Sequence, residues 1–164
     1  MTSHWHCEIF MDPIKPNELV IFLRRPGLRV RTGIWLMPSQ LVGYEKNEAA
    51  RLGIIAADLR DILLDTLPAG TNFAPLDTDR ILQLLNTISY RKDLGDCVLV
   101  HNLDLLLARL TQQQRVDVWK FTFAGFAYRR CALLLGMPAT ASSLLPAGET
   151  LNYWTKGKRL AVSL

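Results

Sequence analysis

Three polar residues directly follow an apolar run in the middle of the chain, and their types suggest a site for chemistry. Residues 98–100 are apolar and β-branched or leucine, and a Gly-Asp pair precedes them. This pattern predicts a buried strand entered through a turn. His101, Asn102 and Asp104 come next. Because α/β sheets bind ligands at the carboxyl ends of their strands, these three are the candidate catalytic residues if the protein is an enzyme.

These three residue types can support few reactions. Hydrolysis of a magnesium nucleotide needs a carboxylate to hold hydrated Mg²⁺ and a second group to orient water. The imidazole of His101 is a poor ligand for a hard cation, and the amide of Asn102 cannot act as a general base. A structural role fits as well, in which His101, Asn102 and Asp104 cap the turn and hydrogen-bond the backbone. We expect no metal site and no required cofactor, with ATP and Mg²⁺ as the remaining candidates.

Cysteine chemistry is not favoured either. The chain has three cysteines, an odd and widely spaced set. Cys97 and Cys131 stand at the heads of apolar runs, so their side chains are expected away from the ligand edge. Reduced core thiols in a cytoplasmic protein are the simplest interpretation.

A second group of candidate residues is basic and lies near the amino terminus. Arg24, Arg25, Arg29 and Arg31 fall within eight residues, and Trp35 follows them. Arginine beside an aromatic side chain is typical both of protein hot spots and of nucleic-acid sites. We therefore predict that these five residues bind a partner, with Trp35 exposed. Charge reversal of Arg29 and Arg31 is expected to abolish partner binding with little effect on the melting temperature.

The bulk composition points to one folded domain. The 164 residues are 49% hydrophobic and 21% charged, with a net charge of +4, which excludes a disordered chain. No apolar run approaches the roughly 20 residues that span a bilayer, so no membrane partner is expected. Residues 1–18 read as an arm, and residues 19–164 as a single α/β domain.

An N-terminal β-hairpin is predicted at the start of that domain. Residues 19–23 are a continuous apolar run of strand length, and the Arg-Arg-Pro-Gly sequence at 24–27 ends it. Residues 29–37 then read as a second extended segment. We expect a tight turn between them that does not wrap an anion.

The rest of the domain alternates strands with helices. Strands are predicted at 53–57, 98–100, 131–138 and 159–164, and helices at 58–67, from 77 or 78 to 88, and from 111 to 125. Asp58 is the expected N-cap of the first helix. This alternation predicts a three-layer α/β sandwich with a mostly parallel central sheet, in which residues 98–100 and 133–135 are parallel.

The apolar run that ends in His101-Asn102-Leu103-Asp104 resembles the second nucleotide motif of AAA+-type P-loop ATPases, in which Asp-Glu-x-Asp follows the strand. Residues 53–164 resemble the back half of an AAA+ or RecA-like core. The size of the chain and this stretch are also similar to the small P-loop protein of BREX-type phage-defence systems. The resemblance implies a degenerate motif, because two acids are replaced. No Gly-x-x-x-x-Gly-Lys-Ser/Thr sequence follows residues 19–23.

The sequence thus favours a non-catalytic, P-loop-like accessory protein. Its expected partner is a larger ATPase or nucleic-acid-processing protein, and the resemblance implies a setting in phage defence. Two alternatives stay open. One is a small NTPase in which arginines of the 24–31 segment replace the phosphate-loop lysine. The other is a basic adaptor that binds DNA.

Overall fold

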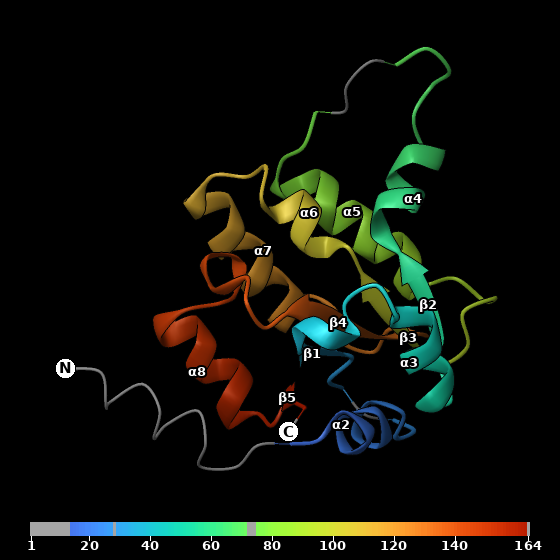
Figure 1. Ribbon diagram of the computed structural model, residues 1–164, viewed down its shortest axis with the longest axis vertical. Coiled ribbons are helices and arrows are strands. Elements are labelled where there is room, and N and C mark those ends of the chain that lie inside the picture. Colours follow the sequence, from blue (N-terminus) through green and yellow to red (C-terminus); the bar gives the residue numbers. More distant parts are fainter. Residues whose placement is uncertain (1–13, 28, 72–74, 164) are drawn as a thin grey trace.

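Five parallel strands form the central sheet of the protein (Figure 1). The computed structural model describes residues 14–27, 29–71 and 75–163. The strands lie in the order β2–β3–β4–β1–β5, and every neighbouring pair is parallel. Their bounds are Thr32–Met37 for β1, Ile55–Asp58 for β2, Cys97–His101 for β3, Ala132–Pro138 for β4 and Leu160–Val162 for β5.

Helices cover both faces of this sheet and complete three layers. Buried residues of α2 and α3 share one core cluster with the sheet, and those of α4 to α8 share the other. The α-helices are α2 (Pro16–Leu23), α3 (Glu45–Arg51), α4 (Leu59–Asp65), α5 (Thr78–Ser89), α6 (Leu103–Leu107), α7 (Gln112–Ala124) and α8 (Gly148–Lys156), and short 3₁₀ turns occupy η1 (Ser39–Leu41) and η2 (Ser142–Leu144). Within the described ranges, no helix combines the length and apolar character that a bilayer crossing requires.

The predicted α/β sandwich is confirmed, together with its central strand pair. Val98 of β3 stands beside Leu133 of β4, and Val100 beside Leu135. The predicted cap of α4 is also present, since the Asp58 carboxylate accepts hydrogen bonds from two backbone N–H groups of the first turn. The crossover helices pack onto the sheet because a strand fully buried on both faces needs apolar cover.

The predicted N-terminal hairpin is wrong. Residues 19–23 belong to helix α2, and β1 pairs in parallel with β4 and β5 instead of with an antiparallel neighbour. Pro16 stands at the first helical position, where its missing N–H costs nothing. The Glu18 carboxylate accepts the Lys15 backbone N–H at 3.4 Å and satisfies the helix start. An apolar run of strand length therefore lies in a helix that buries one face, with Leu19, Val20 and Leu23 inside and Ile21 63% exposed.

Close packing fixes α2 against β1. A Cβ atom at Gly33 would come within 3.0 Å of the Leu19 side chain, so glycine permits the observed approach of helix and strand. Ile14 adds an isolated parallel bridge to Ala161 of β5. The predicted arm at residues 1–18 lies largely outside the described residues, and its boundary with the domain stays a prediction.

Candidate functional site

His101 ends β3 at the carboxyl edge of the sheet, where sequence analysis expected it. The imidazole is buried, with 8% of the residue exposed, and neither ring nitrogen has a hydrogen-bond partner among the residues that the structure describes. Asp58 of β2 is its register partner. The Asp58 carboxylate accepts the Arg60 N–H at 2.9 Å and the Asp61 N–H at 3.3 Å. The Asp58 carboxylate therefore caps the following helix.

Asn102 and Asp104 form the turn from β3 into α6. Asn102 adopts the left-handed conformation with φ of +65°, which asparagine tolerates better than most residues, and its side chain makes no capping hydrogen bond. Asp104 is half-buried, and this burial raises the pKa of its carboxyl group. Its own backbone N–H and that of Leu105 oppose the rise. The Asp104 carboxyl group thus interacts with the backbone of this turn, whereas Asn102 contributes its backbone conformation.

Glu45 is a member of this edge that sequence analysis missed. It begins α3, directly after the loop that follows β1, and is 9% exposed. Its carboxylate accepts the Gly43 backbone N–H at 3.1 Å. Gly43 has φ of +96°, a conformation that glycine adopts readily. The negative charge of Glu45 adds to the rise in the pKa of Asp104, while His101 lowers it.

The signal for Glu45 was the sequence of residues 38–46, a strand end followed by a glycine and a helix start. The sequence pattern predicts the first strand at residues 19–23, so a phosphate loop is expected directly after them. The first strand is β1, so the loop at residues 38–44 occupies that position. It contains Gly43 but no Lys-Ser/Thr pair.

Glu45, His101 and Asp104 form an edge cluster of two acids and one imidazole. Among the described residues, no group of histidine, cysteine and acidic side chains has the arrangement of a metal site. Neither nitrogen of His101 is hydrogen-bonded to an acid, so the described part of the cluster contains no hydrogen-bonded acid–base pair.

The two described cysteines are buried core thiols, as predicted. Burial raises the pKa of Cys97 to about 12 and that of Cys131 to about 11. Because the thiolate is the reactive form, burial suppresses the nucleophilic chemistry of both.

Trp35 is fully buried, which overturns the expectation that it is exposed. It packs in the core between the sheet and α2. Its indole Nε1 donates a hydrogen bond of 2.8 Å to the Ser163 hydroxyl. β1 lies in the sheet interior, so its residues alternate between two covered faces and neither face reaches solvent.

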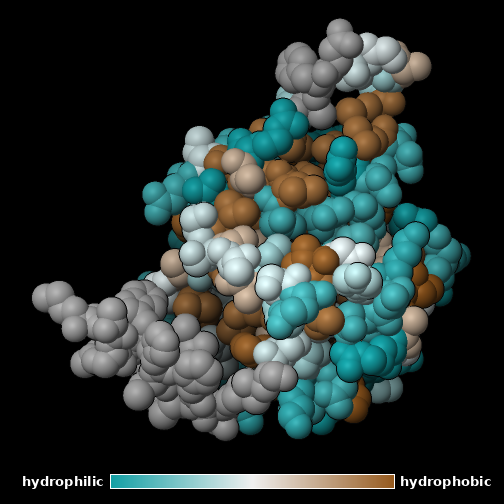
Figure 2. Space-filling view, in the orientation of Figure 1, coloured by the Kyte–Doolittle hydropathy of each residue, from teal (hydrophilic) through white to brown (hydrophobic). Residues whose placement is uncertain are grey.

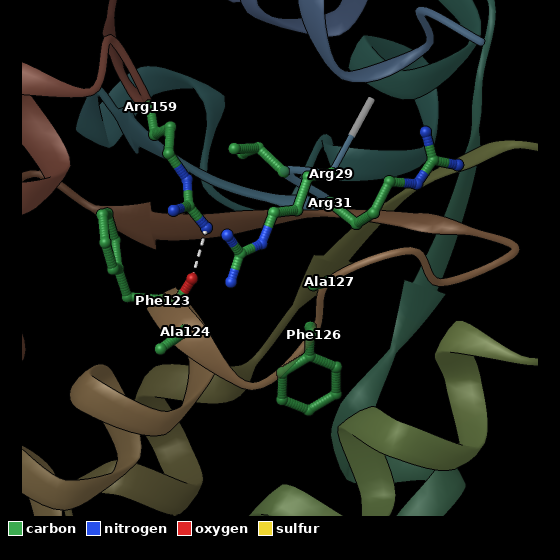
Figure 3. Close-up of a pocket in the computed structure, with 8 residues that line it drawn as sticks. Arg29, Arg31, Phe123, Ala124, Phe126, Ala127 and Arg159 are labelled. Carbon is green, nitrogen blue, oxygen red and sulfur yellow. Dashed lines mark hydrogen bonds between the residues drawn. The ribbon is translucent and has the colours of Figure 1, made fainter. Parts of the chain in front are cut away.

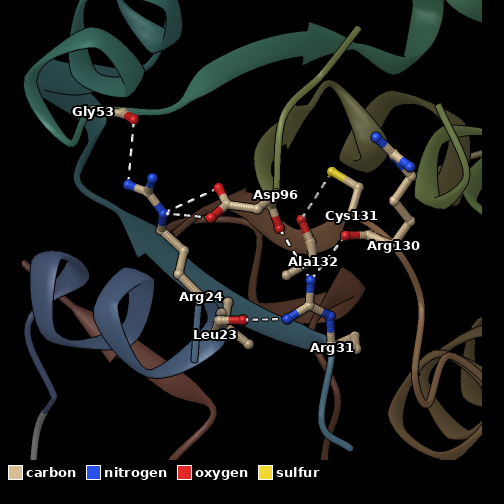
Figure 4. A network of polar contacts seen from close by, with 8 residues as sticks. All are labelled: Leu23, Arg24, Arg31, Gly53, Asp96, Arg130, Cys131 and Ala132. Carbon is tan, nitrogen blue, oxygen red and sulfur yellow. Dashed lines mark hydrogen bonds and ion pairs between the residues drawn. The ribbon is translucent and has the colours of Figure 1, made fainter. Parts of the chain in front are cut away.

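Arg31 is also buried, at 8% exposure, although sequence analysis grouped it with the exposed arginines. Its guanidinium donates to the backbone carbonyls of Leu23, Asp96 and Arg130 (Figure 4). It also donates to the Arg129 carbonyl. All of these acceptors are backbone carbonyls of other chain segments. Arg31 therefore has a structural role, because its side chain links those segments.

The other arginines of the predicted partner site are exposed. The Arg24 guanidinium lies 3.0 Å from the Asp96 carboxylate (Figure 4). The Arg25 guanidinium lies over the Phe22 ring, 5.6 Å from its centre. Arg29 makes no side-chain hydrogen bond within the described ranges. The expected turn is present, with Gly27 at φ of +72°.

The two groups of candidate residues lie at opposite edges of the sheet. Arg29 and Arg31 immediately precede β1, whereas His101 and Asp104 lie at and beyond the end of β3. All strands run in parallel, so the arginines lie at the amino edge and the acids at the carboxyl edge. Comparison of the chain with protein-family models, with curated proteins and with solved structures found no match.

Proposed function

We propose that this protein is a non-catalytic, P-loop-like accessory protein of the cytoplasm. Its partner is a larger ATPase or a nucleic-acid-processing protein, and its setting is phage defence, as the resemblance of the His101–Asp104 stretch implies. The hydrogen bond from Gly43 to Glu45 supports this proposal most directly.

That hydrogen bond matters because it lies where a nucleotide phosphate would sit in a P-loop protein. A phosphate loop works by pointing free backbone N–H groups and a lysine at the anion. Here the N–H of Gly43 already binds a carboxylate, and half-buried Asp104 lies close enough to that carboxylate for its pKa to be raised by it. A phosphate would meet two acids, so like-charge repulsion opposes its binding.

Exposed apolar side chains at the same edge support a protein partner. Val42 and Tyr44 are exposed in the loop before α3, and Leu105 is exposed on α6. Figure 2 shows apolar residues gathered around α5 and α6 on this face. Grouped exposed apolar residues are typical of a contact surface.

The alternative of an unorthodox NTPase has less support. It requires arginines of the 24–31 segment to replace the phosphate-loop lysine, close to Asp104. Those arginines precede β1, at the other edge of the sheet.

We expect ATP with Mg²⁺ to leave the melting temperature of the protein unchanged. A ligand that binds only the native state adds about 2.7 kcal/mol of stability at 100 times its dissociation constant. The test is a thermal melt with ATP·Mg²⁺ raised to about 5 mM, a concentration that would reveal sites in the tens of micromolar by this relation. A saturable rise that Asp104→Asn removes would contradict the proposal and locate a nucleotide at the carboxyl edge.

We expect the larger ATPase proposed as the partner to form a complex with the protein through the exposed residues of the carboxyl edge. Size-exclusion chromatography of the two purified proteins measures it. Tyr44→Asp with Leu105→Asp should abolish co-elution, because a buried unpaired charge is costly at an interface. The control is Tyr153→Asp, an exposed aromatic on α8. Co-elution that survives the double change would exclude this surface.

A further inference from the structure

Two cavities open side by side at the amino edge of the sheet. The first has a volume of about 310 Å³ and lies between Arg29, Arg31 and Arg159 on one side and the end of α7 on the other (Figure 3). The second has a volume of about 360 Å³ and is lined by the 24–27 turn and by Tyr128 and Arg129. Both cavities include Arg31 in their walls, so they are neighbours.

The walls of these cavities are strongly basic. The arginines that line them are Arg24, Arg25, Arg29, Arg31, Arg129 and Arg159. Among the described residues, the only carboxylate in either lining is that of Asp96, which is paired with Arg24. This concentration of positive charge attracts a polyanion.

Two of the arginines are buried and have no acidic partner within the described part of the chain. There, Arg31 hydrogen-bonds to four backbone carbonyls, and Arg159 hydrogen-bonds to Thr32 and to the Phe123 carbonyl. Burial lowers the pKa of Arg159 to about 10, so it stays protonated at neutral pH. The protein thus holds two desolvated cations behind the cavity walls, and no described carboxylate contacts either guanidinium.

Aromatic rings accompany the arginines in both cavities. The Arg159 guanidinium stacks on the Phe123 ring at 4.0 Å. Phe126 also lines this cavity, apart from that pair and near Ala127 (Figure 3). In the second cavity Tyr128 is 73% exposed, and its φ of +57° is unusual for an aromatic residue. The Arg129 guanidinium lies 5.3 Å from the Phe126 ring, and its Nε is buried with no hydrogen-bond partner in the described ranges.

We propose that these paired cavities, which we name the arginine groove, bind single-stranded nucleic acid. Exposed Arg25 and Arg29 contact successive phosphates, and the exposed ring of Tyr128 offers a flat surface on which a base stacks. Stacking on aromatic rings combined with a basic track is the usual chemistry of single-strand recognition.

The shape of the groove distinguishes a single strand from a duplex. Arg31 and Arg159 are recessed in the cavity walls and cannot meet the backbone of a rigid double helix. Duplex DNA is read by an element that projects into a groove, whereas a flexible strand can turn its bases into separate pockets. The two neighbouring cavities match adjacent nucleotides better than one small anion, which would fill only one of them.

The experiment measures fluorescence anisotropy of a labelled 12-nucleotide dT strand with the full chain, from about 50 mM salt upward. We expect the strand to bind with an association constant that falls as salt rises. The slope of log association constant against log salt concentration should be about −0.7 for each phosphate contacted. Arg29→Glu should lower the affinity about tenfold. It should also make that slope less steep by about 0.7, the value for one phosphate contact. Tyr128→Asn keeps a residue that tolerates positive φ and should lower the affinity about tenfold through lost stacking.

Matched controls separate this site from general attraction to a basic protein. Arg60→Glu makes the same charge change on exposed α4 and should alter the affinity less than about twofold, because its charge is distant and screened. A 12-nucleotide abasic strand carries the same backbone charge and should bind more weakly than dT. The proposal fails if dT does not bind at 50 mM salt, if duplex of equal length binds more tightly, or if the abasic strand matches dT. Equal losses in Arg60→Glu and Arg29→Glu would also overturn it.

Discussion

Replacing Arg31 with methionine is expected to lower the free energy of unfolding by about 3–5 kcal/mol. The Arg31 guanidinium donates to the carbonyls of Leu23 at 2.7 Å, Arg129 at 2.9 Å, Arg130 at 3.0 Å and Asp96 at 3.2 Å. Methionine fills a similar volume but leaves these acceptors without their charged donor. The cost is large because hydrogen bonds to a charged group are stronger than neutral ones, and several are lost together.

The physical reason is the position of Arg31 among four chain segments. Its guanidinium joins the end of α2, the entry to β3 and the entry to β4 to the start of β1 (Figure 4). Lysine keeps the charge but has a single nitrogen, so it cannot satisfy carbonyls arranged around a planar fork. We therefore expect Arg31→Lys to recover only a small part of the lost stability.

Urea denaturation followed by circular dichroism measures these changes. Arg29→Met is the matched control, since Arg29 lies two residues away, is exposed and makes no side-chain hydrogen bond within the described ranges. Its free energy of unfolding should stay within about 0.5 kcal/mol of the parent protein. Equal unfolding midpoints for Arg31→Met and Arg29→Met would show that Arg31 does not join these segments. The burial of Arg31 also removes the basis for expecting a double charge reversal at Arg29 and Arg31 to spare the melting temperature.

The sheet core was predictable because its strands carry strong local signals. The runs at 98–100 and 133–135 are apolar and are separated by a helical pattern with a clear N-cap threonine. A parallel neighbour after one crossover helix is the common result of that order. Asp58 was predictable for the same reason, since an aspartate before an amphipathic pattern satisfies the first N–H groups of a helix.

The helix at residues 16–23 was not predictable from periodicity. A short run of consecutive apolar residues fits a buried strand and a buried helix equally, because neither has a polar face. Pro16 and Glu18 were the available signals, a proline at the first turn and an acid near the start. Tertiary packing on β1 at Gly33 decided between the two.

The roles of Glu45 and Arg31 depend on contacts between distant segments. Glu45 could not be recognised from the sequence because it follows the loop after β1. The first strand was predicted at residues 19–23 instead, so this loop was not considered. Arg31 was grouped with its neighbours because a charged residue is usually exposed. Its four acceptors include carbonyls 65 to 99 residues away in the chain, a set that no local pattern reveals.

Trp35→Ala is expected to lower the free energy of unfolding by about 3–5 kcal/mol, the usual cost of truncating a buried large aromatic side chain. Trp35 is completely buried, and its indole Nε1 donates to the Ser163 hydroxyl at 2.8 Å. The loss of stability therefore has two causes. The substitution leaves a cavity in the core between the sheet and α2, and it removes the N–H that donates a hydrogen bond to the Ser163 hydroxyl. Trp35→Phe keeps most of the apolar volume and should cost less than half as much.

Two measurements on the same variants separate a core role from the partner role that the sequence suggested. Urea denaturation gives the stability, and titration of the dT strand or of the ATPase partner at low temperature gives the binding of the folded fraction. If Trp35 belongs to the core, Trp35→Phe binds both as the parent protein does and unfolds at lower urea. Tyr44→Ala, an exposed aromatic control, should unfold within about 0.5 kcal/mol of the parent protein. Unchanged stability with lost binding in Trp35→Phe would return Trp35 to the interface, because only a residue that a partner touches can weaken binding while the core stays intact.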